Sequence, residues 1–368
     1  MFEGRIARFD EVERPFQLRT ERLDGVGPGE ILVRVRRTNV CASDLHAWHG
    51  SFATKGLGGQ LPTVLGHEMV GSVAALGEGV ATDLNGVPLA EGTRVVFPYF
   101  FPCHRCRSCL SGHPISCDRM TMAMLGRADK PPYFVGGFGE YFLLPAEAVV
   151  YVVPDTLPDE YAAGANCALS QVIYGLDRVG QGFGETVVVQ GAGGLGLFAT
   201  AVAKARGAST VITVDGVAER LELAKGFGAD HIVDISAIES SRDRVKRVRE
   251  LTGGRGADVV VEVVGSPAVI DEGLKMLGQF GRYLEIGNIG FGRTAELDPS
   301  RLVFGNKTIV GVSLYDPIVL GTALTFLEQH QHHLPLDRLS GVSYRLDEID
   351  TAFADADSRR VVRAAIVP

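Results

Sequence analysis

Several features that would assign a chain to a particular class are missing here. No run of about 18 apolar residues occurs, so no membrane span is predicted. Residues 1–10 carry four charged side chains and no apolar stretch, so no targeting segment is expected. Lys and Arg number 36 against 44 Asp and Glu, and the resulting net charge of −8 argues against the basic surface of a nucleic-acid-binding protein. Cysteine is also scarce, with six residues in 368.

Few cysteines and no predicted secretion signal indicate a reducing compartment, where clustered thiols bind metal rather than form disulfides. We therefore expect a cytoplasmic protein. The length of 368 residues exceeds what one ordinary core holds and predicts two domains. Charged residues at 22% and hydrophobic residues at 46% are typical of a globular chain. The 46 glycines fall mostly between short apolar runs, which predicts the turns of a strand-rich α/β protein.

The pattern of hydrophobic residues changes near residue 158. Before it, alternation of apolar and charged residues predicts half-buried strands at 30–37, 70–76, 94–97, 138–144 and 149–153. Asn85-Gly86 predicts a hairpin, and 41–46 is expected to be a loop. After it, strands are predicted at 186–190, 210–214, 231–233, 258–264 and 282–286. Helices are predicted at 160–181, 195–206, 218–227, 243–252, 267–278 and 316–330. Regular alternation of strand and helix predicts a doubly wound parallel sheet.

A glycine-rich turn follows the predicted strand 186–190. Gly191-Ala192-Gly193-Gly194-Leu195-Gly196 has the form G-x-G-x-x-G and opens a helix, as a dinucleotide-binding loop does. The glycines allow a pyrophosphate to approach the backbone, and the helix N-terminus attracts that anion. Asp215 lies 19 residues after Gly196, where a carboxylate binds ribose hydroxyls and favours NAD over NADP. Arg220 is a second candidate for the adenosine region, so NADP stays the less favoured alternative.

Four cysteines follow the spacing Cys103-x2-Cys106-x2-Cys109-x7-Cys117. Four thiolates in one short segment can close a tetrahedral Zn²⁺ site, which is structural because it has no open position. An iron–sulfur run would place its fourth cysteine three residues on and follow it with proline, whereas here Asp118 follows. The spacing therefore predicts structural zinc, with disulfide pairing as the alternative.

Cys41 and Cys167 are the remaining cysteines, and His67 lies in the run Gly66-His67-Glu68. Two thiolates and one imidazole would neutralise Zn²⁺ and leave a fourth position open, as catalytic zinc requires. Spacing does not show whether these side chains meet, so two inert buried cysteines are the alternative. The histidines at 330, 332 and 333 end a polar helix and are predicted to be solvated.

These motifs, in this order, resemble those of the zinc-containing medium-chain alcohol dehydrogenase family over essentially the whole chain. Gly66-His67-Glu68-x2-Gly71-x5-Gly77-x2-Val80 is similar to the zinc signature of that family, and the cysteine loop has its 2-2-7 spacing. Cys41-x-Ser43-Asp44-x-His46 resembles the segment that supplies the first zinc ligand, a relay hydroxyl, an orienting Asp and a relay His. Cys167 stands where the family has its remaining cysteine ligand. Arg363 stands where an arginine contacts the cofactor pyrophosphate.

The resemblance implies an α/β fold in which a Rossmann-type doubly wound parallel sheet is inserted in a mainly-β GroES-like catalytic domain. Residues 1–168 would form the catalytic domain with both zinc sites, 169–310 the NAD-binding domain, and 311–368 a return segment. It also implies two Zn²⁺ per chain, NAD as cofactor and a homo-oligomer, either a dimer or a tetramer. No nucleic-acid or membrane partner is expected.

The implied reaction is hydride transfer between nicotinamide and a primary or secondary alcohol, cyclic and aromatic ones included. Zinc would lower the pKa of the alcohol hydroxyl. Ser43 would take up the proton and pass it through the ribose hydroxyls to His46. Asp44 would orient His67, and Glu68 would lie behind the metal. The alternatives are a polyol or sugar dehydrogenase, a kind that tends to lack the third cysteine ligand, and a non-catalytic dehydrogenase-like binding protein.

Some positions depart from the family pattern or match no part of it. Gln171 stands where relatives often have a threonine that contacts the nicotinamide. The segments 82–90 and 120–137 match no family signature. Candidates for walls of the substrate pocket, with core packing as the alternative, are Trp48, Phe52, Tyr99 and Met122.

Overall fold

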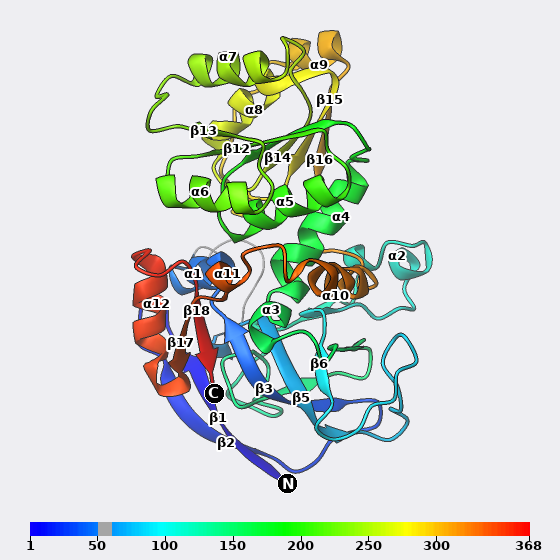
Figure 1. Cartoon of the computed structure of the whole chain (residues 1–368). Coiled ribbons are helices and arrows are strands. Elements are labelled where there is room, and N and C mark those ends of the chain that lie inside the picture. The colour runs from blue at the N-terminus through cyan, green and yellow to red at the C-terminus, as the bar shows by residue number, and fades with distance from the viewer. Residues whose placement is uncertain (51–60) are drawn as a thin grey trace. The chain divides into compact units, whose positions relative to one another are not determined.

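The chain folds into two compact units, seen in a computed structural model that describes residues 1–50 and 61–368 (Figure 1). Unit 1 comprises Met1–Cys167, Asp316–Gln331 and Leu336–Pro368, and unit 2 comprises Ala168–Tyr315 with His332–Pro335. We expected domain boundaries after residues 168 and 310. In the structure the chain passes from unit 1 to unit 2 after Cys167 and returns to unit 1 after Tyr315. Among the helices in the described ranges, none is long and apolar enough to cross a membrane.

Unit 1 is organised by a seven-stranded sheet of order β10-β6-β5-β3-β18-β17, with β9 also paired to β3. The predicted alternation at 30–37 is confirmed in β3, where Arg34 and Arg36 are exposed and the residues around them are buried. A three-stranded sheet, β2-β1-β4, and the pair β7-β8 complete the β structure of the described residues. The strands are β1 (Phe2–Phe9), β2 (Gln17–Leu23), β3 (Ile31–Asn39), β4 (Thr63–Val64), β5 (Glu68–Leu76), β6 (Arg94–Val96), β7 (Phe100–Phe101), β8 (Thr121–Met122), β9 (Tyr141–Leu144), β10 (Tyr151–Val152), β17 (Val342–Arg345) and β18 (Ala364–Val367).

The expectation of a loop at 41–46 was wrong, because a helix, α1, begins at Ala42 and ends at Trp48. Cys41 caps this helix, and its backbone N–H donates to Asp44 Oδ2 at 2.9 Å. The backbone N–H groups at the start of a helix have no hydrogen-bond partners within the helix. The Asp44 carboxylate supplies one such partner, and this stabilises a short, polar helix. The other helices of unit 1 are α2 (Arg107–Leu110), α3 (Asp159–Ala162), α10 (Val319–His330), α11 (Asp337–Ser340) and α12 (Ile349–Asp357), with 3-10 turns η1 (Pro114–Ser116) and η4 (Leu346–Glu348).

Unit 2 contains a six-stranded sheet of order β13-β12-β11-β14-β15-β16, and all of its strand pairs are parallel. This order confirms the predicted doubly wound sheet, because the strands run outward in both directions from β11. Every residue of β11 is buried, as expected of a central strand covered on both faces. The strands are β11 (Thr186–Gln190), β12 (Thr210–Asp215), β13 (His231–Asp234), β14 (Ala257–Glu262), β15 (Leu277–Glu285) and β16 (Thr308–Gly311).

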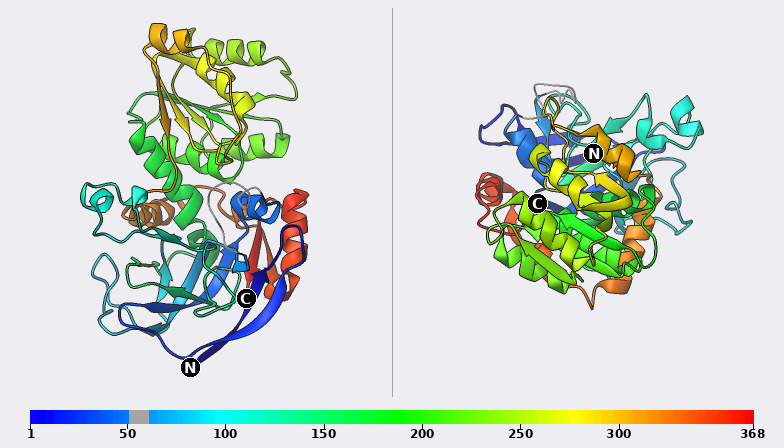
Figure 2. Two further views of the ribbon diagram at one scale, coloured as in Figure 1. Left: turned by 180° about the vertical axis from the view of Figure 1, so that it is seen from behind. Right: turned by 90° about the horizontal axis from the view of Figure 1, so that it is seen from above.

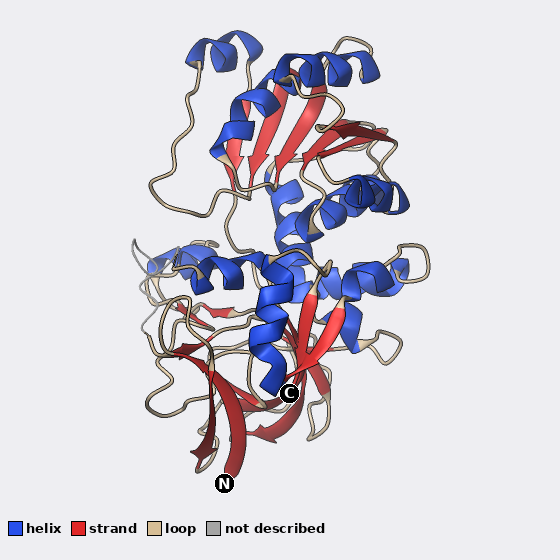
Figure 3. Cartoon of the chain, turned by 90° about the vertical axis from the view of Figure 1, so that its left-hand side faces the viewer, coloured by secondary structure: helices blue, strands red, loops and turns tan. Residues whose placement is uncertain are grey.

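Helices cover both faces of this sheet (Figures 2 and 3). Helices α4 to α6 pack together on one face, while α7 and α8 pack together on the other. The prediction of one helix over 160–181 was too simple, since a π-helical turn, η2 (Ala165–Leu169), separates α3 from α4. The strand β15 also begins inside the segment predicted as helix 267–278. The helices are α4 (Ser170–Arg178), α5 (Gly194–Ala205), α6 (Ala218–Gly226), α7 (Ser241–Leu251), α8 (Ile270–Met276) and α9 (Pro299–Gly305), with the 3-10 turn η3 (Pro267–Val269).

Candidate metal centre and cofactor loop

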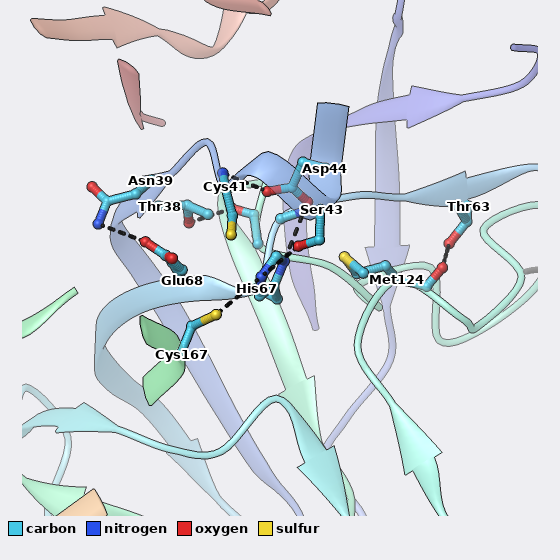
Figure 4. Close-up of polar contacts among 12 residues, drawn as sticks. Thr38, Asn39, Cys41, Ser43, Asp44, Thr63, His67, Glu68, Met124 and Cys167 are labelled. Atoms are coloured by element: carbon cyan, nitrogen blue, oxygen red, sulfur yellow. Dashed lines mark hydrogen bonds and ion pairs between the residues drawn. The ribbon is translucent and has the colours of Figure 1, made fainter. Parts of the chain in front are cut away.

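Four buried side chains with metal-ligand atoms converge in unit 1: Cys41, His67, Glu68 and Cys167 (Figure 4). One ligand atom from each lies within 4.8 Å of the others. Cys41 directly precedes α1, and His67 directly precedes β5. Glu68 is the first residue of β5, and Cys167 belongs to η2. The fold thus brings together the three residues that spacing alone left unconnected. We call this group the buried cluster.

The turn before His67 requires glycine. Gly66 has a φ of +89°, a conformation that side chains with a Cβ rarely adopt. A Cβ at this position would also lie 2.9 Å from the backbone nitrogen of Phe138. The backbone N–H of Gly66 donates to Asp44 Oδ1 at 3.1 Å, so the turn and α1 are held together.

Asp44 fixes the imidazole of His67. Its Oδ1 lies 3.2 Å from His67 Nδ1, and neither side chain is accessible to solvent beyond 2%. A proton on Nδ1 therefore donates to the carboxylate, and Nε2 is the nitrogen that would bind a metal. Burial lowers the pKa of His67, but Asp44 and Cys41 raise it well above its ordinary value. Nε2 faces Cys167 Sγ at 3.6 Å and Ser43 Oγ at 3.2 Å. His46 lies in the same helix as Ser43 and is exposed.

The donor geometry of the buried cluster fits zinc. Zn–S bonds of about 2.3 Å and Zn–N bonds of about 2.0–2.1 Å give a tetrahedral S···N edge of about 3.6 Å. The observed distance from Cys167 Sγ to His67 Nε2 is 3.6 Å. Two sulfurs and an imidazole nitrogen are also the donors that catalytic zinc uses in proteins. Cys41, His67 and Cys167 therefore fit Zn²⁺ in donor type and in proximity.

The pKa values of the two thiols in the buried cluster are shifted in opposite directions. The hydrogen bond with Cys167 lowers the pKa of Cys41 well below its ordinary value against the opposing effect of burial, and His67 adds to this. The same bond and burial raise the pKa of Cys167. One thiolate is therefore already favoured at the site, and its hydrogen-bonded neighbour shares the remaining proton.

Glu68 is held by partners other than the predicted ligands. Arg363 Nη2 lies 2.9 Å from its Oε2, and Asn39 Nδ2 donates to Oε2 at 3.3 Å. Burial raises the pKa of this carboxyl to about 7, although Arg363 opposes the effect. Arg363, predicted to contact the cofactor pyrophosphate, is thus engaged by Glu68 within unit 1. Its contact with a cofactor remains a prediction.

Two asparagines that support the cluster were missed from the sequence. Asn166 Nδ2 donates to the backbone oxygens of His67 and Phe97, both at 2.9 Å, and Asn39 contacts Glu68. A clue was present, because Asn166 interrupts an alanine-rich run directly before Cys167. A polar side chain buried in such a run must find hydrogen-bond partners.

The four residues suggested as pocket walls differ in their surroundings. The ring of Tyr99 lies 4.8 Å from that of His67, centroid to centroid. Trp48 instead packs on Phe353 with centroids 6.1 Å apart, in the core of unit 1. Met122 lies in β8 and is partly buried. Phe52 falls outside the described residues.

The second group, Cys103, Cys106, Cys109 and Cys117, forms what we call the loop cluster. Its Sγ atoms lie within 4.8 Å of one another, with Cys106 at 3.5 Å from Cys109 and 3.9 Å from Cys117. A zinc tetrahedron with bonds of about 2.3 Å has S···S edges of about 3.8 Å. A disulfide needs about 2.05 Å. The geometry therefore fits a four-thiolate zinc site.

Backbone N–H groups prepare the loop cluster for negative charge. The N–H groups of Cys103 and Arg119 donate to Cys117 Sγ at 3.2 and 3.3 Å. Hydrogen bonds from the backbone of Cys109 and Asp118 lower the pKa of Cys106 to about 6. Thiolates are the form that binds metal, so the loop itself stabilises Cys106 in that form, whereas burial raises the pKa of Cys109 to about 12.

The glycine loop in unit 2 has the predicted geometry. A Cβ on Gly196 would lie 1.9 Å from the backbone oxygen of Gly191, so glycine is required there. Asp215 ends β12, and its Oδ2 accepts a hydrogen bond from Ala192 N at 2.7 Å. The carboxylate therefore lies directly against the loop. Arg220 is partly exposed in α6, and Gln171 is buried in α4.

A parallel sheet that carries a glycine loop, together with two groups of metal-ligating side chains, is typical of metal-binding oxidoreductases. Two family models match the chain: "Alcohol dehydrogenase GroES-like domain" over residues 27–155 and "Zinc-binding dehydrogenase" over residues 194–329. These matches confirm the expected fold class.

Named relatives extend over almost the whole chain. The 5-exo-hydroxycamphor dehydrogenase of Pseudomonas putida is 34% identical over 92% of each chain. The erythritol/L-threitol dehydrogenase of Mycolicibacterium smegmatis is 31% identical over 93% of this chain and 91% of its own. An alcohol dehydrogenase structure from Thermotoga maritima aligns over 100% of both chains with a TM-score of 0.92 and 27% identity. The chain belongs to the zinc-dependent medium-chain dehydrogenase/reductase family, and it is an oxidoreductase that acts on alcohols.

Proposed function

We propose that the protein is a zinc-dependent dehydrogenase that oxidises a secondary, cyclic alcohol with NAD and catalyses the reverse reduction. The observation that carries the proposal is the convergence of Cys41, His67 and Cys167, with the Ser43 hydroxyl 3.2 Å from the ligand nitrogen of His67. Three protein ligands leave one position for a small molecule, which distinguishes this cluster from a closed structural site.

The chain's own groups account for proton movement and for the support of the ligands. When bound, zinc supplies Lewis acidity that lowers the pKa of an alcohol hydroxyl, and NAD accepts the hydride. Ser43 Oγ, 3.2 Å from His67 Nε2, would accept the hydroxyl proton and pass its own proton on through the ribose hydroxyls of the cofactor. His46 lies three residues on in α1 and is exposed, so it delivers the proton to solvent. Asp44 keeps Nδ1 of His67 protonated and Nε2 free to bind metal.

Glu68 is assigned to charge balance behind the metal rather than to metal binding. Its carboxylate is occupied by Arg363 and Asn39, which supports three ligands from Cys41, His67 and Cys167. We also propose a second zinc in the loop cluster, and therefore two zinc ions per chain. Elemental analysis checks this count: one ion or none would contradict it.

NAD is the proposed cofactor because of Asp215. A carboxylate at the end of the second strand accepts hydrogen bonds from ribose hydroxyls and repels a 2′-phosphate. We expect Asp215→Gly to raise the ratio of kcat/KM with NADP to that with NAD by about tenfold, a change of about 1.4 kcal/mol. Asp234→Gly, at the end of β13, serves as the control. An unchanged ratio would show that Asp215 does not select the cofactor.

The relatives suggest two substrate classes. The hydroxycamphor dehydrogenase is named for a cyclic secondary alcohol, and the erythritol/L-threitol dehydrogenase for polyols. Cys167 as third ligand favours the first class. Initial rates with cyclohexanol, borneol, benzyl alcohol, erythritol and sorbitol decide between them. Higher kcat/KM with erythritol or sorbitol than with the cyclic alcohols would overturn the assignment, and no turnover of any alcohol would overturn the activity.

We further propose a cytoplasmic homo-oligomer. All six cysteines are free, and both clusters need reduced thiols, which supports a reducing compartment. The dimer or tetramer is proposed from the family, and light scattering of the purified protein measures it. A monomer at micromolar concentration would contradict this part of the proposal.

A further inference from the structure

Two acidic side chains meet at the carboxyl edge of the sheet in unit 2. Glu262 ends β14 and Glu285 ends β15, and the two residues are paired in register. In a sheet of this order a dinucleotide crosses the carboxyl edge at the point where strand order reverses. The glycine loop and Asp215 follow β11 and β12, so the adenosine half belongs to that side. The nicotinamide half then belongs to the side of β14 and β15.

Asn288 connects the two carboxyl groups. Its Nδ2 donates to Glu262 Oε2 and to Glu285 Oε1, each at 3.0 Å, and its backbone N–H also donates to Glu285 Oε1 at 3.0 Å. The other oxygen of Glu262 accepts from Val264 N at 2.7 Å and from Gly265 N at 2.8 Å. The three side chains therefore tie the segment after β14 to the segment after β15. We call them the acidic latch.

The acidic latch has more acceptors than donors. Glu285 Oε2 and Asn288 Oδ1 are buried, and neither has a hydrogen-bond partner among the described residues. A buried oxygen without a donor costs about 1–3 kcal/mol, and two adjacent carboxylates repel. One proton held between the carboxyl groups relieves both penalties. In agreement, burial and then the bond with Glu285 raise the pKa of Glu262 to about 8.

Resting on dinucleotide binding as proposed above, we propose that Glu262, Glu285 and Asn288 are positioning residues for the nicotinamide half of the cofactor, acting through one shared proton. With the proton present, the segments 263–265 and 286–288 are fixed against each other at the edge that receives the ring. Without it, two buried carboxylates repel and the segments separate. The cofactor half that depends on these segments is then bound less tightly.

Other charged groups near the latch do not replace the shared proton. Tyr283 in β15 donates its hydroxyl to Gln190, and Glu272 in α8 is paired with Arg244 at 2.6 Å. Arg293 donates to the backbone oxygen of Gly265 at 3.0 Å and not to a carboxylate of the latch. Because the pKa of Glu262 in the folded protein lies above the ordinary value of 4.5, the protonated latch stabilises the fold at low pH. That effect is lost as pH rises through about 8.

The test compares two ligands of the zinc-loaded protein at about pH 7 and about pH 9. NADH has the nicotinamide half, whereas ADP-ribose lacks it. We expect the Kd of NADH to rise up to about tenfold between these values, because one pH unit above the pKa leaves about one tenth of the latch protonated. The Kd of ADP-ribose should stay within about twofold. Fluorescence titration and calorimetry measure the two constants.

Glu285→Gln removes the dependence on pH, because an amide supplies a permanent N–H in place of the shared proton. The Kd of NADH for this variant should be the same at both pH values. The control is Glu222→Gln, whose side chain is exposed in α6, and its Kd should depend on pH as in the wild type. Glu262→Gln is the second variant, since its amide oxygen still accepts from Val264 N. Circular dichroism checks folding.

Three results would overturn the inference. If the Kd of NADH still depends on pH in Glu285→Gln, another group titrates. If ADP-ribose binding weakens with pH in parallel with NADH binding, or is lost in both glutamine variants, the latch supports the whole unit rather than one end of the cofactor. A wild-type protein that binds ADP-ribose and NADH with no pH response contradicts the latch alone. Failure to bind either ligand contradicts the proposed function instead.

Discussion

The two clusters in unit 1 have similar ligands but are built in opposite ways. The loop cluster takes four sulfurs from one segment, residues 103–117, and two of its cysteines are partly exposed. The buried cluster takes its ligands from three segments, with His67 and Cys167 separated by 100 residues, and every member is buried. A local cluster depends on its own loop, whereas a dispersed one exists only when the whole fold has formed.

The surroundings differ as much as the construction. In the loop cluster, backbone N–H groups stabilise the sulfurs, and a closed set of four thiolates leaves no position for chemistry. In the buried cluster, side chains support the members: Asp44 contacts the ligand His67, and Arg363 contacts Glu68 behind it. Side chains can adjust proton affinity and orientation in ways that a fixed backbone does not. The first cluster is suited to structure and the second to catalysis.

The largest predicted effect separates the clusters by activity. His67→Ala should reduce kcat by on the order of 10³-fold or more, because the loss of a ligand removes several kcal/mol of Lewis-acid stabilisation. NADH binding should stay within about twofold, since the glycine loop lies in unit 2. His113→Ala, in the loop that carries the other cluster, is the matched control and should keep nearly full activity. Comparable losses in both variants would remove the functional distinction.

A smaller effect is expected from the support of the ligand. Asp44→Asn keeps the size of the side chain but no longer holds the imidazole by a charged acceptor, so kcat/KM should fall by about 10–100-fold. Asp83→Asn is the control, because Asp83 is also buried in unit 1 and accepts from three backbone N–H groups, those of Asn85, Val87 and Val152. It should lower the melting temperature without changing kcat/KM. Equal activity losses would mean that Asp44 acts only through folding.

The same contrast explains how far sequence could predict the molecule. The loop cluster and the glycine loop are local patterns, so spacing was sufficient to predict that the four sulfurs converge and that the loop joins a strand to a helix. The buried cluster needed contacts between distant segments, and spacing alone did not decide between a zinc site and two inert buried cysteines until family resemblance connected Cys41 and Cys167. Helix α1 was predicted as a loop, and its start depends on one bond, from Cys41 N to the Asp44 carboxylate. Distant Gly66 and His67 hold that carboxylate, and no local pattern reveals those contacts. The partner of Glu68, Arg363, is 295 residues away and no local pattern reveals it.

The acidic latch was also invisible from sequence. Glu262 and Glu285 follow unremarkable apolar strands, and only the register of β14 and β15 brings them together. A pair of carboxyl groups on two neighbouring strands has no characteristic spacing in the sequence, whereas the ligands of a local metal site do. Chemistry that depends on sheet register is therefore the part of this protein that required a structure.

The smallest expected effect on activity concerns the loop cluster itself. Cys109→Ser should remove one zinc per chain and lower the melting temperature by about 5–10 °C, because a change of about 1 kcal/mol shifts the melting temperature of a chain this large by about 2–4 °C. The kcat at 25 °C should stay within about threefold, since the buried cluster holds itself through α1, β5 and η2 rather than through this loop. Ser108→Ala, the neighbouring position, should change neither zinc content nor melting temperature. A loss of activity as deep as that of His67→Ala, with folding intact, would show that the loop cluster shapes the catalytic centre and that the two sites are not independent.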